Sequence, residues 1–179
     1  KAVIFVPEEY IPQEIMRGKI FATKSLVKKQ IRAIRELEGE VDNLLADTNS
    51  EEIAGEKAKE LAGKLREFQI CVENAFAFIA ENFDGGIPKS DNVHESLLDQ
   101  MTKSIENSRP PVIDGFLAQN LKEYIDLRLD LEKNAESFGD GQRVKTLLSS
   151  YKEVSQSSRD QLINFFDELE KFYGLKNPG

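Results

Sequence analysis

Few residues of this chain have the side chains that enzymes usually employ near neutral pH. His94 is the only histidine and Cys71 the only cysteine among 179 residues. General acid–base and nucleophilic catalysis usually need a histidine, a reactive cysteine or paired carboxylates. Asp91 and His94 have the spacing of half a metal-binding pair, but a di-iron bundle needs two Glu-x-x-His units, and there is no second histidine. We therefore expect His94 to be a surface or packing residue.

Other motifs that would indicate an enzyme or a metalloprotein are missing from the sequence. Residues 84–95 have the length of a calcium loop, but Gly86 and Pro88 stand where oxygen ligands are needed, and Lys89 takes the glycine position. The sequence has no glycine-rich phosphate loop, no Gly-x-Ser-x-Gly elbow and no Arg-to-His spacing typical of helical ribonucleases. We expect a protein that is not an enzyme and binds no cofactor or metal ion.

The composition is that of an acidic folded domain. Hydrophobic residues make up 40% of the chain, enough to bury a core, and the net charge is −8. Such a charge argues against general nucleic-acid binding, and no run of about 18 apolar residues predicts a membrane span. The short apolar start, residues 2–6, could be the remainder of a removed leader, and the location would then be extracytoplasmic or lumenal. It could equally be an arbitrary boundary of the chain, which leaves the location open.

Helical periodicity runs through nearly the whole chain. Thr48 followed by Glu51 predicts a capping box at the start of a second helix. Asn92 with Glu95 predicts another at the start of a third helix. The five helices that we expect cover residues 13–47, 48–83, 92–105, 114–138 and 144–172.

Helix lengths and short connections predict the fold class. At 1.5 Å per residue the first, second and fifth helices would each be about 50 Å long. A single helix of this length cannot bury its apolar face, so the helices must pack together. Short connections make neighbouring helices antiparallel. We expect an all-α protein: an elongated antiparallel four-helix bundle over residues 13–175, with one extra short helix and an extended N-terminal arm over residues 1–12.

The arm, KAVIFVPEEYIP, differs from the rest because it reads as an extended segment. Pro7 and Pro12 disfavour a helix there. The arm could pack along a groove of its own bundle or add an extended ribbon to another protein, and we favour the second. The residues expected to contact the partner are Val3, Phe5 and Tyr10.

A cationic segment follows the arm. Between Glu14 and Glu36 every charged residue is basic, although cations near the start of a helix oppose its dipole. Something should therefore offset their charge. The seven residues are Arg17, Lys19, Lys24, Lys28, Lys29, Arg32 and Arg35.

Two explanations for these cations stay open. An antiparallel second helix could bring Glu67 and Glu73 alongside to pair with them. Alternatively, they dock on an acidic partner, for which Lys24, Lys28 and Arg32 are suited because they share one face at four-residue spacing. Reversing these three residues to glutamate should weaken association and leave folding intact if docking is correct.

Phenylalanines crowd the second half of the second helix and the end of the fifth. They could line a cavity for an apolar molecule such as a lipid or a pigment, although aromatic residues at helical spacing usually form core. Phe78 and Phe166 do not align with the apolar face of their helices and are expected on a partner-facing patch. Cys71 is expected to be a buried thiol. The candidate ligand-contacting residues are Phe68, Phe76, Phe83, Phe165 and Phe172.

These patterns together predict a non-catalytic interaction or structural subunit that docks on another protein or protein complex. A carrier of an apolar molecule is the alternative. A proline-bearing lead before an acidic four-helix bundle resembles the layout of extrinsic subunits that dock on large membrane complexes, such as those on the lumenal face of photosystem II. The resemblance in layout implies a position at the periphery of a membrane complex.

Overall fold

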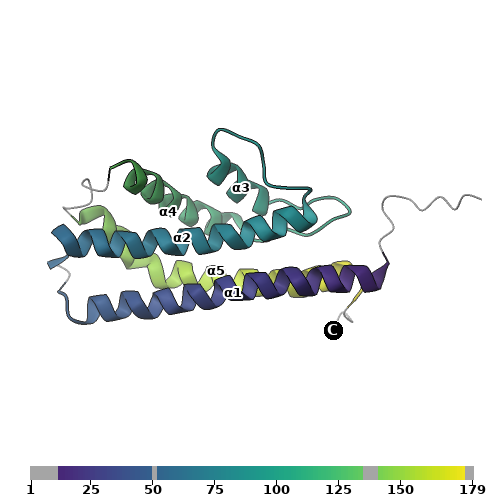
Figure 1. Cartoon of the computed structure of the whole chain (residues 1–179), viewed down its shortest axis with the longest axis horizontal. Helices are drawn as coiled ribbons and strands as arrows, with labels where there is room; N and C mark the ends of the chain where they lie inside the picture. The colour runs from purple at the N-terminus through teal and green to yellow at the C-terminus, as the bar shows by residue number, and fades with distance from the viewer. Residues whose placement is uncertain (1–11, 50–51, 135–140, 176–179) are drawn as a thin grey trace, which may run out of the picture.

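The computed structural model describes residues 12–49, 52–134 and 141–175, which form five helices (Figure 1). The expected arm contacts Val3, Phe5 and Tyr10 lie outside the described residues. The helices are α1 (Gln13–Ala46), α2 (Gly55–Phe83), α3 (Val93–Met101), α4 (Gly115–Lys133) and α5 (Gln142–Phe172).

The four longer helices form the predicted antiparallel bundle. α1 packs on α2 and α5, while α4 packs on α2 and α5 from the other side (Figure 1). α3 packs on α2 and α4 near the C-terminal end of α2. The 34 residues of α1 give a rod about 51 Å long, so the elongated all-α bundle is confirmed. None of the described helices is long and apolar enough to cross a membrane.

The core is a continuous cluster of aliphatic and aromatic side chains from all five helices. Near its middle, Phe68 of α2 packs edge-to-face against Tyr124 of α4 and Tyr151 of α5, with ring centroids 5.3 and 5.4 Å apart. These rings join three helices at one point. α1 adds the seven-residue series visible in the sequence: Ile20, Val27, Ile34 and Val41.

The two buried tyrosines make the stability of the fold sensitive to alkaline pH. Burial raises the pKa of Tyr124 from 10.0 to about 12. Burial also raises the pKa of Tyr151, and the Glu38 carboxylate adds to the rise. A phenol that titrates near 10 when unfolded and higher when folded stabilises the fold fully below pH 10, and this contribution is lost as pH rises towards 12.

We therefore expect the double variant Tyr124→Phe/Tyr151→Phe to lose less unfolding free energy than the wild type between about pH 9 and about pH 11. Urea unfolding at a series of pH values measures the two slopes. The slopes are the informative quantity, because Tyr124 also donates a hydrogen bond to the Leu147 carbonyl oxygen at 3.2 Å. Equal slopes would contradict the prediction.

The start of α2 differs from the prediction. α2 begins at Gly55, and the predicted capping box at Thr48 is wrong. The Thr48 hydroxyl donates to the Leu44 carbonyl oxygen at 2.8 Å, so it continues the end of α1 instead of opening the next helix. Glu51 lies outside the described residues. Asn92 does precede α3, but its side chain makes no capping hydrogen bond.

α3 ends earlier than predicted, at Met101 and not at Ile105. Ile105 and Arg109 pair in a short antiparallel bridge, which turns the chain back. The amides of Val112 and Ile113 then donate to the Met101 carbonyl oxygen at 2.9 and 3.2 Å. The segment between α3 and α4 is therefore an ordered loop that satisfies the end of α3.

The remaining helix ends follow the sequence signals more closely. α4 starts after Asp114, whose carboxylate accepts a hydrogen bond from the Leu117 amide at 2.8 Å. α4 ends at Lys133, and Phe138, where we predicted its end, lies outside the described residues. α5 ends before Gly174, which has the left-handed φ of 68° that glycine adopts readily.

Candidate interaction surface

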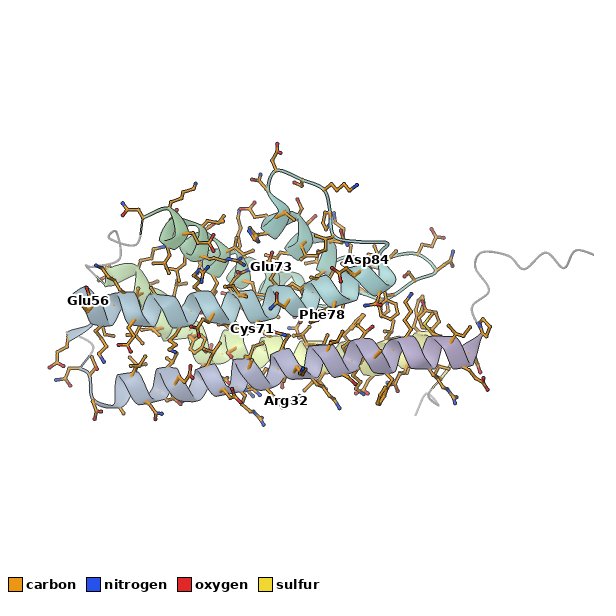
Figure 2. The ribbon with its side chains drawn as sticks, in the orientation of Figure 1. Arg32, Glu56, Cys71, Glu73, Phe78 and Asp84 are labelled. Carbon is orange, nitrogen blue, oxygen red and sulfur yellow. The ribbon has the colours of Figure 1, made fainter. Side chains whose placement is uncertain are left out.

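Five cations of α1 form one row along its solvent-facing side. Positions three or four residues apart fall on the same face of a helix. The row lies on the α5 side of α1, since Lys24 Nζ is 3.7 Å from a carboxylate oxygen of Glu170 in α5. Figure 2 shows Arg32 on the side of α1 that faces away from α2. This row, called the cationic stripe below, consists of Arg17, Lys24, Lys28, Arg32 and Arg35.

The stripe is not neutralised by the carboxylates that we considered. Glu67 pairs with Lys64 of its own helix at 3.9 Å, and Glu73 binds Arg128 of α4 at 2.5 Å. The expectation that Glu67 and Glu73 offset the cations of α1 is therefore wrong. Four stripe residues have no ion pair among the described residues: Arg17, Lys28, Arg32 and Arg35.

The second half of α1 behaves differently. Three of its acidic residues are partnered by basic residues of α2 and α5. The pairs are Glu38 with Arg159, Glu40 with Lys64, and Asp42 with Lys152, each at 3.1 Å. Lys19, one of the two cations of α1 outside the stripe, lies over the Phe83 ring at 5.0 Å and belongs to the α1–α2 interface.

An exposed phenylalanine lies within the stripe. Phe21 is 73% exposed and stands between Arg17 and Lys24 along α1. Beside it is a groove of about 310 Å³ between the first half of α1 and the end of α5. Aromatic and arginine side chains are enriched at the energetic centres of protein interfaces. The groove is lined by Arg17, Ile20, Phe21, Lys24, Glu170 and Leu175.

Most of the phenylalanines proposed to bind a ligand are core residues. Phe68, Phe76, Phe83 and Phe165 are buried, while Phe172 is partly exposed at the end of α5. A ligand among the four buried rings would have to displace packed side chains.

The two phenylalanines expected on a surface patch do not form one. Phe166 is buried, so its predicted exposure is wrong, because α5 contacts α1, α2 and α4 and is covered on more than one side. Its ring packs edge-to-face on Phe165, with centroids 5.1 Å apart. Phe78 is half-buried against the core.

The histidine belongs to a polar network between α2, α3 and α4. His94 Nδ1 contacts one oxygen of Glu73, and Arg128 binds the other at 2.5 Å. Figure 2 shows Glu73 on the part of α2 beneath α3 and α4. Arg128 and Arg66 also bind Glu132, each at 3.0 Å, and their hydrogen bonds lower the pKa of Glu132. Because each charged group has a partner inside the network, it acts as a clamp between three helices.

The surroundings of Cys71 disfavour a reactive thiol. Burial raises the pKa of the Cys71 thiol and the nearby Glu67 adds to the rise, which disfavours the reactive thiolate. Within residues 12–49, 52–134 and 141–175, no group of three or more His, Cys, Asp or Glu side chains is placed to hold a metal ion.

A family model described as HepT-like protein matches residues 60–169, more than half of the chain. The chain belongs to the HepT-like family. The HepT-like segment runs from the second turn of α2 to near the end of α5, so it contains the His94 network, whereas the cationic stripe of α1 precedes it. No curated protein and no solved structure matches the chain, so the expected resemblance in layout to extrinsic photosystem subunits is not tested by these comparisons.

Proposed function

We propose that this HepT-like protein is a non-catalytic interaction subunit that docks on another protein or protein complex through the cationic stripe of α1. The observation that supports this is the contrast within one helix. Arg17, Lys28, Arg32 and Arg35 are exposed and have no ion pair in the described part of the chain. The acids Glu38, Glu40 and Asp42 of the same helix are all paired.

The stripe is electrostatically unfavourable in the isolated chain. Lys28 and Arg32 are four residues apart, and like charges at this spacing destabilise a helix by roughly 0.2–0.5 kcal/mol per pair. Arg17 adds a cation near the positive end of the helix dipole. A carboxylate-bearing partner would remove both effects, and complementary charge would also speed its approach.

The N-terminal arm is proposed as a second contact, on the basis of its sequence. Its apolar residues Val3 and Phe5 and the aromatic Tyr10 suit an extended ribbon on a partner. Pro12 leads into α1 five residues before Arg17, so a protein bound on the stripe is within reach of the arm.

A charge-reversal experiment tests the proposal. The stripe variant replaces three exposed cations with glutamate, and we expect it to lose partner affinity by about tenfold or more with an unchanged thermal unfolding midpoint. Lys24 is left intact because it pairs with Glu170. Co-purification from the native source with quantitative mass spectrometry measures the loss. The substitutions are Arg17→Glu, Lys28→Glu and Arg32→Glu.

A control variant with the same change in net charge distinguishes an effect of the stripe itself from an effect of net charge alone. It reverses exposed lysines away from α1, and we expect it to retain the partner. Equal partner binding by both variants, or equal loss from both, would contradict docking through the stripe. The control substitutions are Lys89→Glu, Lys122→Glu and Lys133→Glu.

A further inference from the structure

The groove beside Phe21 has the properties of a binding site for a particular kind of protein segment; this inference rests on the proposed function. Its floor is apolar, because Ile20 is buried and Leu175 is half-buried. Phe21 forms an exposed apolar wall, and Arg17 and Lys24 stand on either side of that ring along α1.

The exposed apolar surface continues along α5. Ile163 is 44% exposed and lies seven residues before Glu170, so the two share one face of that helix. Glu170 is next to Lys24 of the antiparallel α1. Ile163 is therefore displaced along the bundle from the level of Lys24 towards that of Arg32, which gives the α1–α5 face a second apolar point beside the cations.

The dimensions and the flanking charges favour a short peptide over a long polyanion. From Arg17 to Arg35 the stripe covers 19 residues of helix, about 27 Å. Glu14 and Glu36 bound it at the two ends, and Glu170 lies inside the groove. A nucleic acid continuing past the stripe would meet these carboxylates and a protein of net charge −8.

We infer that the occupant is an acidic amphipathic α-helix of a partner protein. A helix packs naturally along the furrow between two antiparallel helices, and amphipathic helices in apolar grooves are a recurring mode of peptide recognition. Its apolar side chains lie against Phe21 and Ile163, and its carboxylates face Arg17, Lys28 and Arg32. The cations fix the position of the helix, and burial of the Phe21 ring supplies most of the affinity.

Fluorescence anisotropy with a defined probe tests this inference. The probe is a fluorescein-labelled synthetic helix of about 18 residues, with leucines along one face and glutamates on both flanks. We expect it to bind the wild type, and Phe21→Ala to weaken binding about tenfold. The matched control is Phe116→Ala, since Phe116 of α4 is 78% exposed, close to the 73% of Phe21, and we expect this variant to bind as the wild type does.

Two further probes define the results that would overturn the inference. One is a peptide of the same composition with the leucines scattered around the helix, and the other is a single-stranded RNA of similar length. Binding of either as tightly as the amphipathic helix, or no binding of the helix, would overturn it. If Phe21→Ala keeps the native partner while the stripe variant loses it, the inference fails and the proposed function stands.

Discussion

Replacement of Arg109 by methionine is expected to lower the free energy of unfolding by about 3–5 kcal/mol. The Arg109 side chain is fully buried, and the carboxylate of Asp84, at the end of α2 (Figure 2), is only 2% exposed. Two hydrogen bonds of 2.5 and 2.7 Å join the groups. Methionine preserves much of the volume but leaves the Asp84 charge buried without its counter-ion, which is far costlier than losing an exposed pair.

Arg109 also holds the loop that follows α3. Its guanidinium donates to the carbonyl oxygens of Lys103 at 2.8 Å and Gln100 at 3.2 Å. In the variant the Lys103 carbonyl oxygen would lose this donor, which adds to the expected loss, whereas the Gln100 carbonyl oxygen still accepts from the Lys103 amide at 3.2 Å.

The control for this prediction is Arg143→Met, which removes a pair with Asp130 whose side chains are 41% and 52% exposed. Here we expect a change below about 1 kcal/mol. Urea unfolding followed by circular dichroism measures both variants. Similar losses at the two sites would contradict the assignment of Arg109 as a buried anchor.

Replacement of Gly141 by alanine should destabilise the protein by about 2–5 kcal/mol. Gly141 precedes α5 with a φ of 77°, in the left-handed region that L-residues rarely adopt. An added Cβ would also lie 1.9 Å from the Ile53 carbonyl oxygen. Because that obstacle is backbone, no side-chain rotation relieves the contact, and the start of α5 or the segment before α2 must move.

Gly85→Ala is a closely matched control. Gly85 has the same φ of 77°, but nothing lies within 4 Å of a Cβ placed there. We expect its free energy of unfolding to fall by only about 1–2 kcal/mol, which is the cost of the left-handed conformation for alanine. The difference between the two unfolding free energies then isolates the contact with Ile53. Equal losses would show that α5 does not start against the carbonyl of Ile53.

The architecture was predictable because its signals are local and repeated. The series Ile20, Val27, Ile34 and Val41 marks the buried side of α1. The predicted start of α4 near Asp114 also agrees with the structure, where a local contact fixes it: the Asp114 carboxylate accepts a hydrogen bond from the Leu117 amide. The capping box predicted at Thr48 was wrong because a threonine hydroxyl can donate to a carbonyl of the preceding turn as well as accept from an amide of the next helix.

The buried polar contacts were not predictable for a corresponding reason. Arg109 reads as a surface residue before two prolines, and its burial depends on Asp84, 25 residues away in the sequence. His94 and Glu73 meet only because α3 packs back onto α2. Such contacts depend on the register between packed helices, which leaves no periodic mark in the sequence.

The cationic stripe was predictable from the sequence only in part. Its common face follows from the spacing of Lys24, Lys28 and Arg32 alone. The register between the helices determines whether carboxylates lie next to the stripe. In the structure Glu67 and Glu73 instead pair with residues of α2, α3 and α4. Helix register therefore rules out pairing of the stripe with Glu67 and Glu73, and docking on a partner stays a proposal.

Carbodiimide crosslinking of the protein with its native partner tests docking through the stripe most directly, because this reagent joins a lysine amine to a carboxylate in contact with it. Our account predicts crosslinked peptides that join Lys28 to an aspartate or glutamate of another protein. It also predicts that these peptides disappear in Arg17→Glu/Arg32→Glu and persist in Lys89→Glu/Lys133→Glu. Crosslinks from Lys28 only to carboxylates of its own chain, or partner crosslinks only from lysines such as Lys122 on α4, would contradict it.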